Sequence, residues 1–212
     1  MRIDIWSDIS CPWCYITKRT FERGLAASGR TDLEIILHPY QIDGEHPAEP
    51  RPMLEWLADK YGEERARSMN KEVVAAGPGH GIAFRNETGF AANTFEAHRL
   101  LWFVGRTYGR TVQSRLEELL FAAYFTEGGN VSDPRLLMDR AVRAGADRPR
   151  IEILLASDQG ADRVRGLIRG ARAQGVTRVP LFVFDGVVRL CGARDDPADF
   201  VWALEDTQGN VP

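Results

Sequence analysis

The feature that most constrains the fold is the cysteine pair in the segment Cys11-Pro12-Trp13-Cys14. This segment follows a short apolar run typical of a strand, residues 2–7, and opens a run of helical character over residues 11–28. A thiol at the first turn of a helix lies beside free backbone N–H groups and the positive end of the helix dipole, which stabilise an anion. The pattern therefore predicts that Cys11 is the thiolate nucleophile of a redox-active dithiol.

The second cysteine of the pair lies one helical turn further along the chain. From this position Cys14 can attack a mixed disulfide that has formed at Cys11. Pro12 suits the first turn, where no backbone donor is needed and φ is already helical. Trp13 is expected to present a surface for partner contact, with packing in the core as the alternative.

A cysteine pair of this spacing can also be half of a zinc site. That interpretation needs two further ligands, but Cys191 and four scattered histidines form no second pair. A permanent structural disulfide is also disfavoured, because closing so short a loop removes little chain entropy. We therefore expect no metal and no cofactor.

A second constraint lies near the other end of the chain, where Val179-Pro180 precedes the apolar run 181–184. A proline cannot donate to a sheet ladder, so it belongs at the first residue of a strand. Asp185-Gly186 predicts a two-residue hairpin turn, followed by a strand over 187–190. In this register Pro180 faces Cys191 at a distance of roughly 5 Å.

Four groups of motifs, spread from the start to the end of the chain, carry a resemblance to a known family. They are Asp8-Ile9-Ser10-Cys11-Pro12-Trp13-Cys14-Tyr15, Asn93-Thr94 with Ala97-His98-Arg99-Leu100, Gly175-Val176 with Val179-Pro180, and Phe182-Val183-Phe184-Asp185-Gly186. In these the chain resembles the thioredoxin superfamily, more closely its DsbA-like branch, and most closely the cytosolic FrnE-like subgroup.

The resemblance implies an α/β thioredoxin fold with an inserted all-helical domain, and thiol–disulfide exchange as the chemistry. It also implies a cis Val179–Pro180 bond beside the dithiol, with Val179 and Pro180 holding an extended substrate backbone. Pro12, Trp13, Val179 and Pro180 are thus the expected substrate-binding residues. The substrates would be thiols or disulfides, of proteins or of small molecules, with glutathione as a candidate redox partner.

The domain boundaries follow from where the helical pattern interrupts the strand pattern. We expect residues 1–47 and 159–212 to form the thioredoxin-like domain, and residues 48–158 to form an inserted block of six or seven helices with no strand between them. A proline-broken linker over 46–52 would lead into this block. The segment 77–81 is expected to be a loop, because it alternates glycine with proline and histidine.

Two further residues each allow two interpretations. The FrnE-like pattern has serine where this chain has Cys191, so Cys191 is either a third redox thiol near the active site or a small, half-buried hydrophobic residue. His98 lies in a helical pattern among apolar residues, so it is either structural or an acid–base group that titrates near neutral pH.

The composition limits the remaining classes of function. The 212 residues are 44% hydrophobic and 27% charged, and the formal charge of −3 favours neither nucleic acid nor an anionic membrane as a partner. The N-terminus lacks an apolar signal core and the chain has few cysteines, so we expect a cytoplasmic protein, monomeric or homodimeric.

One alternative activity is a glutathione-dependent transferase or isomerase of the kappa-class or hydroxychromene carboxylate isomerase type. Those enzymes share the fold implied by the resemblance but use a serine in place of the first cysteine. The presence of Cys11 and an intact Cys14 argues against this alternative.

Overall fold

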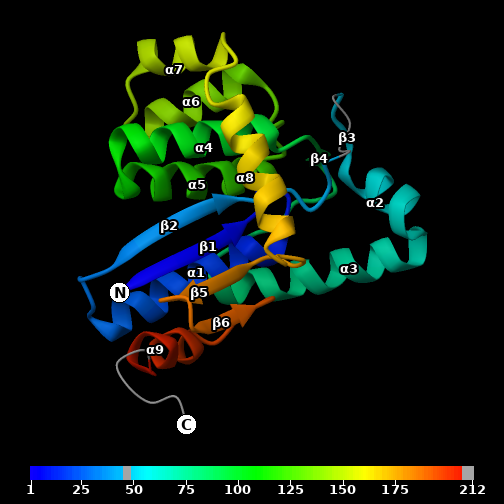
Figure 1. Cartoon of the computed structure of the whole chain (residues 1–212). Coiled ribbons are helices and arrows are strands. Elements are labelled where there is room, and N and C mark those ends of the chain that lie inside the picture. The colour runs from blue at the N-terminus through cyan, green and yellow to red at the C-terminus, as the bar shows by residue number, and fades with distance from the viewer. Residues whose placement is uncertain (45–48, 207–212) are drawn as a thin grey trace.

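The structure is a computed structural model that describes residues 1–44 and 49–206. Its centre is a mixed four-stranded sheet of order β2-β1-β5-β6 (Figure 1). The strands are β1 (Arg2–Ser7), β2 (Glu34–Pro39), β5 (Leu181–Phe184) and β6 (Val188–Cys191). β1 is parallel to β2 and antiparallel to β5, so the two ends of the chain meet at the centre of the sheet.

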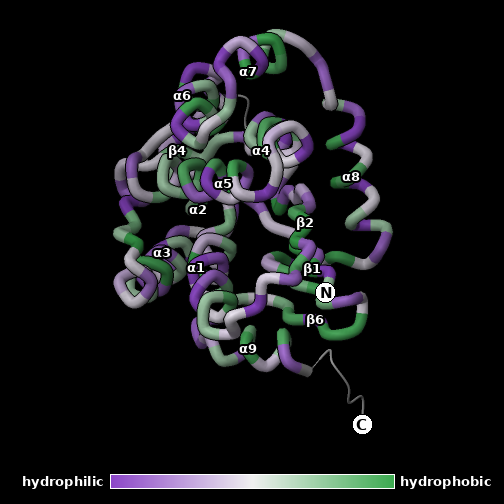
Figure 2. The backbone as a smooth tube through the Cα atoms, turned by 90° about the vertical axis from the view of Figure 1, so that its left-hand side faces the viewer, coloured by the Kyte–Doolittle hydropathy of each residue, from purple (hydrophilic) through white to green (hydrophobic). Residues whose placement is uncertain are grey.

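Helices cover both faces of this sheet, as Figure 2 shows with α1 and α8 on opposite sides of β1. On one face α1 (Pro12–Ser28) and α9 (Pro197–Asp206) pack through a group of phenylalanines from α1, β5 and α9. On the other face α8 (Ala161–Ala173) covers the alternate side chains of β5. Pro12 opens α1, and Gly29 ends it in the left-handed conformation with φ 63°. The α/β thioredoxin fold is confirmed.

The helices that lie between β2 and α8 in the sequence form a block. They are α2 (Met53–Tyr61), α3 (Glu63–Ala76), α4 (Phe95–Tyr108), α5 (Arg110–Phe125), α6 (Pro134–Ala144) and α7 (Arg148–Leu155). In Figure 1, α4 to α7 stack beyond the β2 edge, whereas α2 and α3 lie at the right of the view. One large core cluster joins residues of this block to Cys14, Tyr15 and Ile16 of α1. The start of α1 is therefore enclosed between the sheet and the helical block.

Two predictions about the block were wrong. It contains a two-residue strand pair, β3 (Arg51–Pro52) with β4 (Phe90–Ala91), which is too short to leave a periodic signal in the sequence. The segment predicted as a loop contains a 3-10 helix, η1 (Gly77–His80), which Gly81 ends at φ 70°. A proline is tolerated in the first turn of such a helix because no backbone donor is required there.

Parts of two predicted segments lie outside the described residues. These are the start of the proline-broken linker, residues 46–48, and the end of the second thioredoxin-like segment, residues 207–212. In the described part of the chain, no helix combines the length and apolar character that crossing a bilayer requires.

The register of the β5–β6 hairpin differs by one residue from the prediction. Asp185 and Gly186 both have positive φ, at 45° and 77°, and the Val187 N–H donates to the Phe184 carbonyl at 2.9 Å. The ladder then resumes with Phe184 opposite Val188, which leaves Val187 as an extra residue, or bulge. The expectation that Pro180 faces Cys191 was therefore wrong. Cys191 faces Leu181 instead.

Candidate active site

Cys11 occupies the N-cap position of α1, with φ −94° and ψ 109°. Its carbonyl accepts hydrogen bonds from the N–H groups of Cys14 at 3.0 Å and Tyr15 at 3.4 Å, while no side chain caps the helix. Cys11 is only 4% exposed, and its Sγ lies 3.9 Å from the Val179 carbonyl oxygen. This position gives a Cys11 thiolate the partial positive charge of the helix N-terminus.

Cys14 lies one turn deeper and is 2% exposed. Burial raises the pKa of the Cys14 thiol well above its ordinary value, and its hydrogen bond to Cys11 raises it further. Hydrogen bonds from the Asp8 N–H and the Ser7 side chain lower the pKa of Cys14, but by less than burial and Cys11 raise it. Both cysteines are free thiols, and their sulfurs lie in contact. Their environments differ, because Cys11 lies at the N-terminus of α1 and Cys14 is enclosed one turn deeper.

A small cavity of about 20 Å³ lies behind Cys14. Lys18, Glu117 and Pro180 line it together with Cys14. Burial raises the pKa of the Glu117 carboxyl above its ordinary value, although Arg110 and Lys18 oppose the change. A cavity of this size has room for about one water molecule.

The predicted substrate-binding pair lies directly beside the dithiol. The Val179–Pro180 peptide bond is cis. Val179 is half-buried and Pro180 is buried against the Cys14 cavity. Among the described residues nothing accepts a hydrogen bond from the Val179 N–H, so this donor is available to an incoming backbone.

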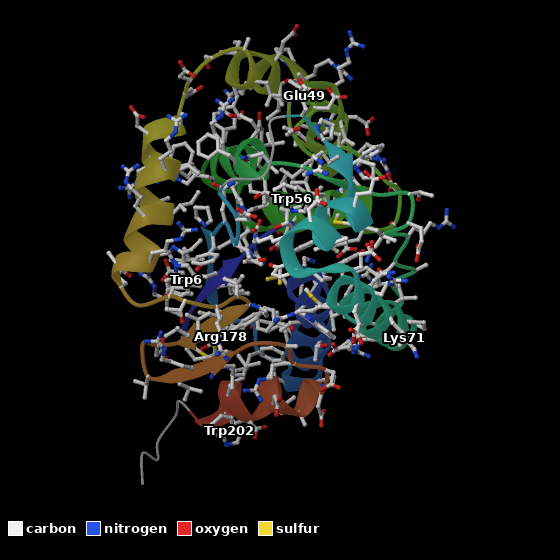
Figure 3. The ribbon with its side chains drawn as sticks, turned by 90° about the vertical axis from the view of Figure 1, so that its right-hand side faces the viewer. Trp6, Glu49, Trp56, Lys71, Arg178 and Trp202 are labelled. Atoms are coloured by element: carbon white, nitrogen blue, oxygen red, sulfur yellow. The ribbon has the colours of Figure 1, made fainter. Side chains whose placement is uncertain are left out.

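Pro12 and Trp13 lie at the mouth of the site, both half-buried. Trp13 borders two hollows. One, of about 210 Å³, is bordered by Cys11 and by α2, α3 and α5, and the other, of about 520 Å³, is bordered by Val179, Arg178 and Gly192. Figure 3 looks onto this face, with Trp56 of the first hollow above and Arg178 of the second below.

Cys191 pairs with Leu181 and not with Pro180. It is exposed at the end of β6, and in the described structure it lines none of the hollows next to Cys11, Trp13 or Cys14. Its neighbour Gly192 donates to the Pro180 carbonyl at 2.9 Å and so occupies the place predicted for Cys191. The cause is the Val187 bulge, which moves each later residue of β6 by one position.

Sequence reasoning missed the role of Asp8. Its buried carboxylate accepts hydrogen bonds from the Ser10 hydroxyl at 2.8 Å, the Ile42 N–H at 2.7 Å and the Thr94 hydroxyl at 2.9 Å, and His98 Nε2 lies 3.1 Å away. Burial alone would raise the pKa of Asp8, but His98 and the hydrogen bonds outweigh it and lower the pKa. A charged residue directly after a buried strand and three residues before Cys11 was the available signal. His98 belongs to this network and not to the dithiol surface.

Comparison with known proteins agrees with this arrangement. A family model described as a DSBA-like thioredoxin domain matches residues 2–204. The chain belongs to this family. It is thus a member of a family of DsbA-like thiol–disulfide oxidoreductases, which act on thiol and disulfide substrates. A search of curated proteins found no match.

Several solved structures are similar over the whole chain. A probable DsbA oxidoreductase from Streptomyces coelicolor is 32% identical, with a TM-score of 0.88 over 100% of this chain and 92% of that one. The cytosolic disulfide reductase DsbM from Pseudomonas aeruginosa is 16% identical, with a TM-score of 0.67 over 98% of both chains. A 2-hydroxychromene-2-carboxylate isomerase is 17% identical, with a TM-score of 0.62 over 98% of this chain and 94% of that one. The last two likenesses show the fold alone.

Proposed function

We propose that the protein is a dithiol oxidoreductase in which Cys11 is the nucleophile and Cys14 the resolving thiol. The observation that supports this most directly is the asymmetry of the pair. Cys11 lies at the helix N-terminus and borders a hollow at the surface, whereas Cys14 is enclosed and its pKa is raised. A substrate sulfur can reach the first thiol but not the second.

The reaction of the reduced protein with a disulfide has two steps. The Cys11 thiolate attacks one substrate sulfur, which forms a mixed disulfide and releases the other sulfur as a thiolate. Cys14 then loses its proton and attacks Cys11 Sγ, which closes the Cys11–Cys14 bond and releases the second substrate thiolate. Two electrons pass from the dithiol to the substrate, and the reverse sequence reduces the protein.

The second step needs a base, because a buried thiol with a raised pKa stays protonated at neutral pH. Glu117 is the group we assign to this task. Its carboxylate, across the small cavity, accepts the Cys14 proton through one water molecule, and its own raised pKa brings its affinity for a proton closer to that of the thiol.

The backbone of Val179 positions the substrate in this proposal. Its free N–H donates to a carbonyl of an extended substrate, next to the Cys11 sulfur. Pro12 and Trp13 contribute the side-chain surface on the other side of the sulfur. Cys191 remains a candidate accessory thiol only for a partner that reaches the exposed end of β6.

Trapping the mixed disulfide tests the division of roles. In a Cys191→Ser background, a Cys14→Ser protein mixed with glutathione disulfide should accumulate glutathione on Cys11, as mass spectrometry of the acid-quenched protein would detect. The matched Cys11→Ser protein should leave Cys14 unmodified on the same time scale. Equal labelling of both variants would contradict the assignment.

We also propose that the protein belongs to the FrnE-like subgroup and acts in the cytoplasm. The four motif groups support the first statement. The chain departs from the pattern of the subgroup at Cys191, where that pattern has a serine. The small number of cysteines supports the second, because disulfide frameworks are rare in reducing compartments.

A further inference from the structure

The hollow that Cys11 borders is here called the aromatic pocket. Its walls come mainly from the helical block, with Met53, Trp56, Leu57 and Tyr61 on α2 and Tyr124 and Phe125 at the end of α5. Cys11 is 4% exposed and borders this pocket, whereas it does not border the outer hollow on the Val179 side. A group attached to a sulfur that bonds with Cys11 therefore enters or adjoins the aromatic pocket.

The volume of the pocket suits one aromatic ring. The pocket measures about 210 Å³. An apolar cavity of about 150 Å³ in another protein stays dry and binds benzene. Most of the lining consists of ring faces and of aliphatic and thioether surface, and Ser10, Asn70 and Asn86 are its uncharged polar side chains. The larger part of the surface therefore favours stacking and apolar contact.

The charges at the pocket disfavour an anionic occupant. Lys60 is the one cationic side chain among its described lining residues, and it is paired with Asp43. Glu72 adds a second carboxylate at the edge that the pocket shares with the outer hollow. A carboxylate of glutathione would meet no spare positive charge here and would lose its hydration.

We propose that the aromatic pocket binds the uncharged aromatic group of a small thiol or disulfide, so that such compounds exchange with Cys11 in preference to glutathione. This inference rests on the proposed function. A thiolate of this class attacks Cys11 Sγ of the oxidised protein, which breaks the Cys11–Cys14 bond and leaves a protonated Cys14. The aromatic group then occupies the pocket in the mixed disulfide. A second thiol attacks the substrate sulfur of that mixed disulfide, which releases the organic disulfide and the reduced protein.

Reduction of the oxidised protein by benzyl mercaptan, mercaptoethanol and glutathione tests the inference. All three carry the sulfur on a saturated carbon, and each rate is divided by the rate with which the same thiol reduces a small disulfide without protein. We expect the normalised rate for benzyl mercaptan to exceed those of the other two by about tenfold or more. Acid quenching, alkylation and mass spectrometry give the fraction of protein reduced.

Two pocket variants and one control assign the preference to the pocket. Trp56→Ala removes an aromatic wall and Met69→Glu adds a carboxylate to the lining, so each should lower the preference for benzyl mercaptan at least about threefold. Trp202→Ala is the matched control, because Trp202 is 52% exposed on α9 and remote from the pocket. It should leave the preference unchanged.

The possible outcomes separate this inference from the proposed function. Equal normalised rates for the three thiols, or a preference that Trp56→Ala and Met69→Glu both leave unchanged, would overturn the inference while the dithiol chemistry stands. Failure of every thiol to reduce a Cys11–Cys14 disulfide would contradict the proposed function itself.

Discussion

At the scale of single residues, the site is governed by buried groups whose surroundings shift their proton affinities in opposite directions. Asp8 and Glu117 are both buried carboxyls close to the dithiol. Asp8 accepts several hydrogen bonds and its pKa is lowered, whereas burial dominates for Glu117 and its pKa is raised. Asp8 therefore holds the start of α1 in place as a stable anion, and Glu117 is suited to exchange protons.

We expect Glu117→Gln to slow the closure of the Cys11–Cys14 bond roughly a hundredfold or more, because the Cys14 proton loses its acceptor. The wild-type rate should rise with pH as Glu117 ionises, and the variant should lack this rise. Single-turnover decay of the mixed disulfide across a pH series measures both effects. Glu118→Gln is the control, since Glu118 does not line the Cys14 cavity. Retention of the pH rise in Glu117→Gln would contradict the role.

The same substitution should stabilise the protein at neutral pH. A carboxyl whose pKa is raised by folding holds its proton more tightly in the native state, so the free energy of unfolding falls as pH increases above the unfolded value of about 4.3. Glu117→Gln removes this fall, and its advantage over wild type should grow with pH. Urea unfolding at pH 5 and pH 8 measures the difference, and an equal difference at both would contradict the shift.

Asp8→Asn should have the opposite effect on stability. The lowered pKa of Asp8 contributes stability above the unfolded value of about 3.9, and this is lost as pH falls through the lower folded value. At pH 7 the variant replaces a carboxylate that accepts hydrogen bonds from Ser10, Ile42 and Thr94 with an amide, so we expect a loss of about 1–3 kcal/mol in urea unfolding. Asp4→Asn, on the preceding strand β1, is the partly exposed control and should cost about 1 kcal/mol or less.

At the scale of elements, the position of the site depends on the close packing of α1 against α9. A Cβ placed on Gly24 would lie 2.7 Å from Phe200 Cβ and 2.9 Å from the Pro197 carbonyl oxygen. The two helices can therefore contact each other this closely only with glycine at position 24. Because both cysteines lie at the N-terminus of α1, the packing of α1 on α9 also fixes the direction in which the dithiol points.

Gly24→Ala should lower the free energy of unfolding by about 1–3 kcal/mol, because the added methyl group forces α1 away from α9. Gly166→Ala provides the contrast, since Gly166 lies in α8 with open space around it. Alanine there should raise stability by about 0.5–1 kcal/mol through its higher helix propensity. Chemical denaturation of both proteins gives the two signs, and a stabilised Gly24→Ala protein would contradict the packing argument.

At the scale of the whole molecule, the periodic elements were predictable and the contacts between distant segments were not. The first strand, the first helix and the strand over Leu181–Phe184 were predicted within a residue, because apolar periodicity and caps are local signals. The Val187 bulge shifted the predicted partner of Cys191, since one extra residue changes every later pairing. No local pattern could place Glu117, which reaches Cys14 only through the docking of α5 on α1.

The shared core predicts that the sheet and the helical block unfold together. Ile16 and Tyr15 of α1 pack in the same cluster as Leu100 of α4 and Phe121 of α5. We expect one cooperative transition, with far-ultraviolet circular dichroism and tryptophan fluorescence giving the same midpoint. Two separated transitions would show that the helical block is an independent unit.

The central claim is that Cys11 and Cys14 form one two-electron couple. Its most direct test is equilibration of the reduced protein across glutathione redox buffers, followed by acid trapping, alkylation and mass analysis of each cysteine. The account predicts that both cysteines convert together, with a midpoint that gives the direction of electron flow. A pair that never closes, with glutathione accumulating on Cys11 alone, would contradict it and favour a glutathione-dependent transferase or isomerase.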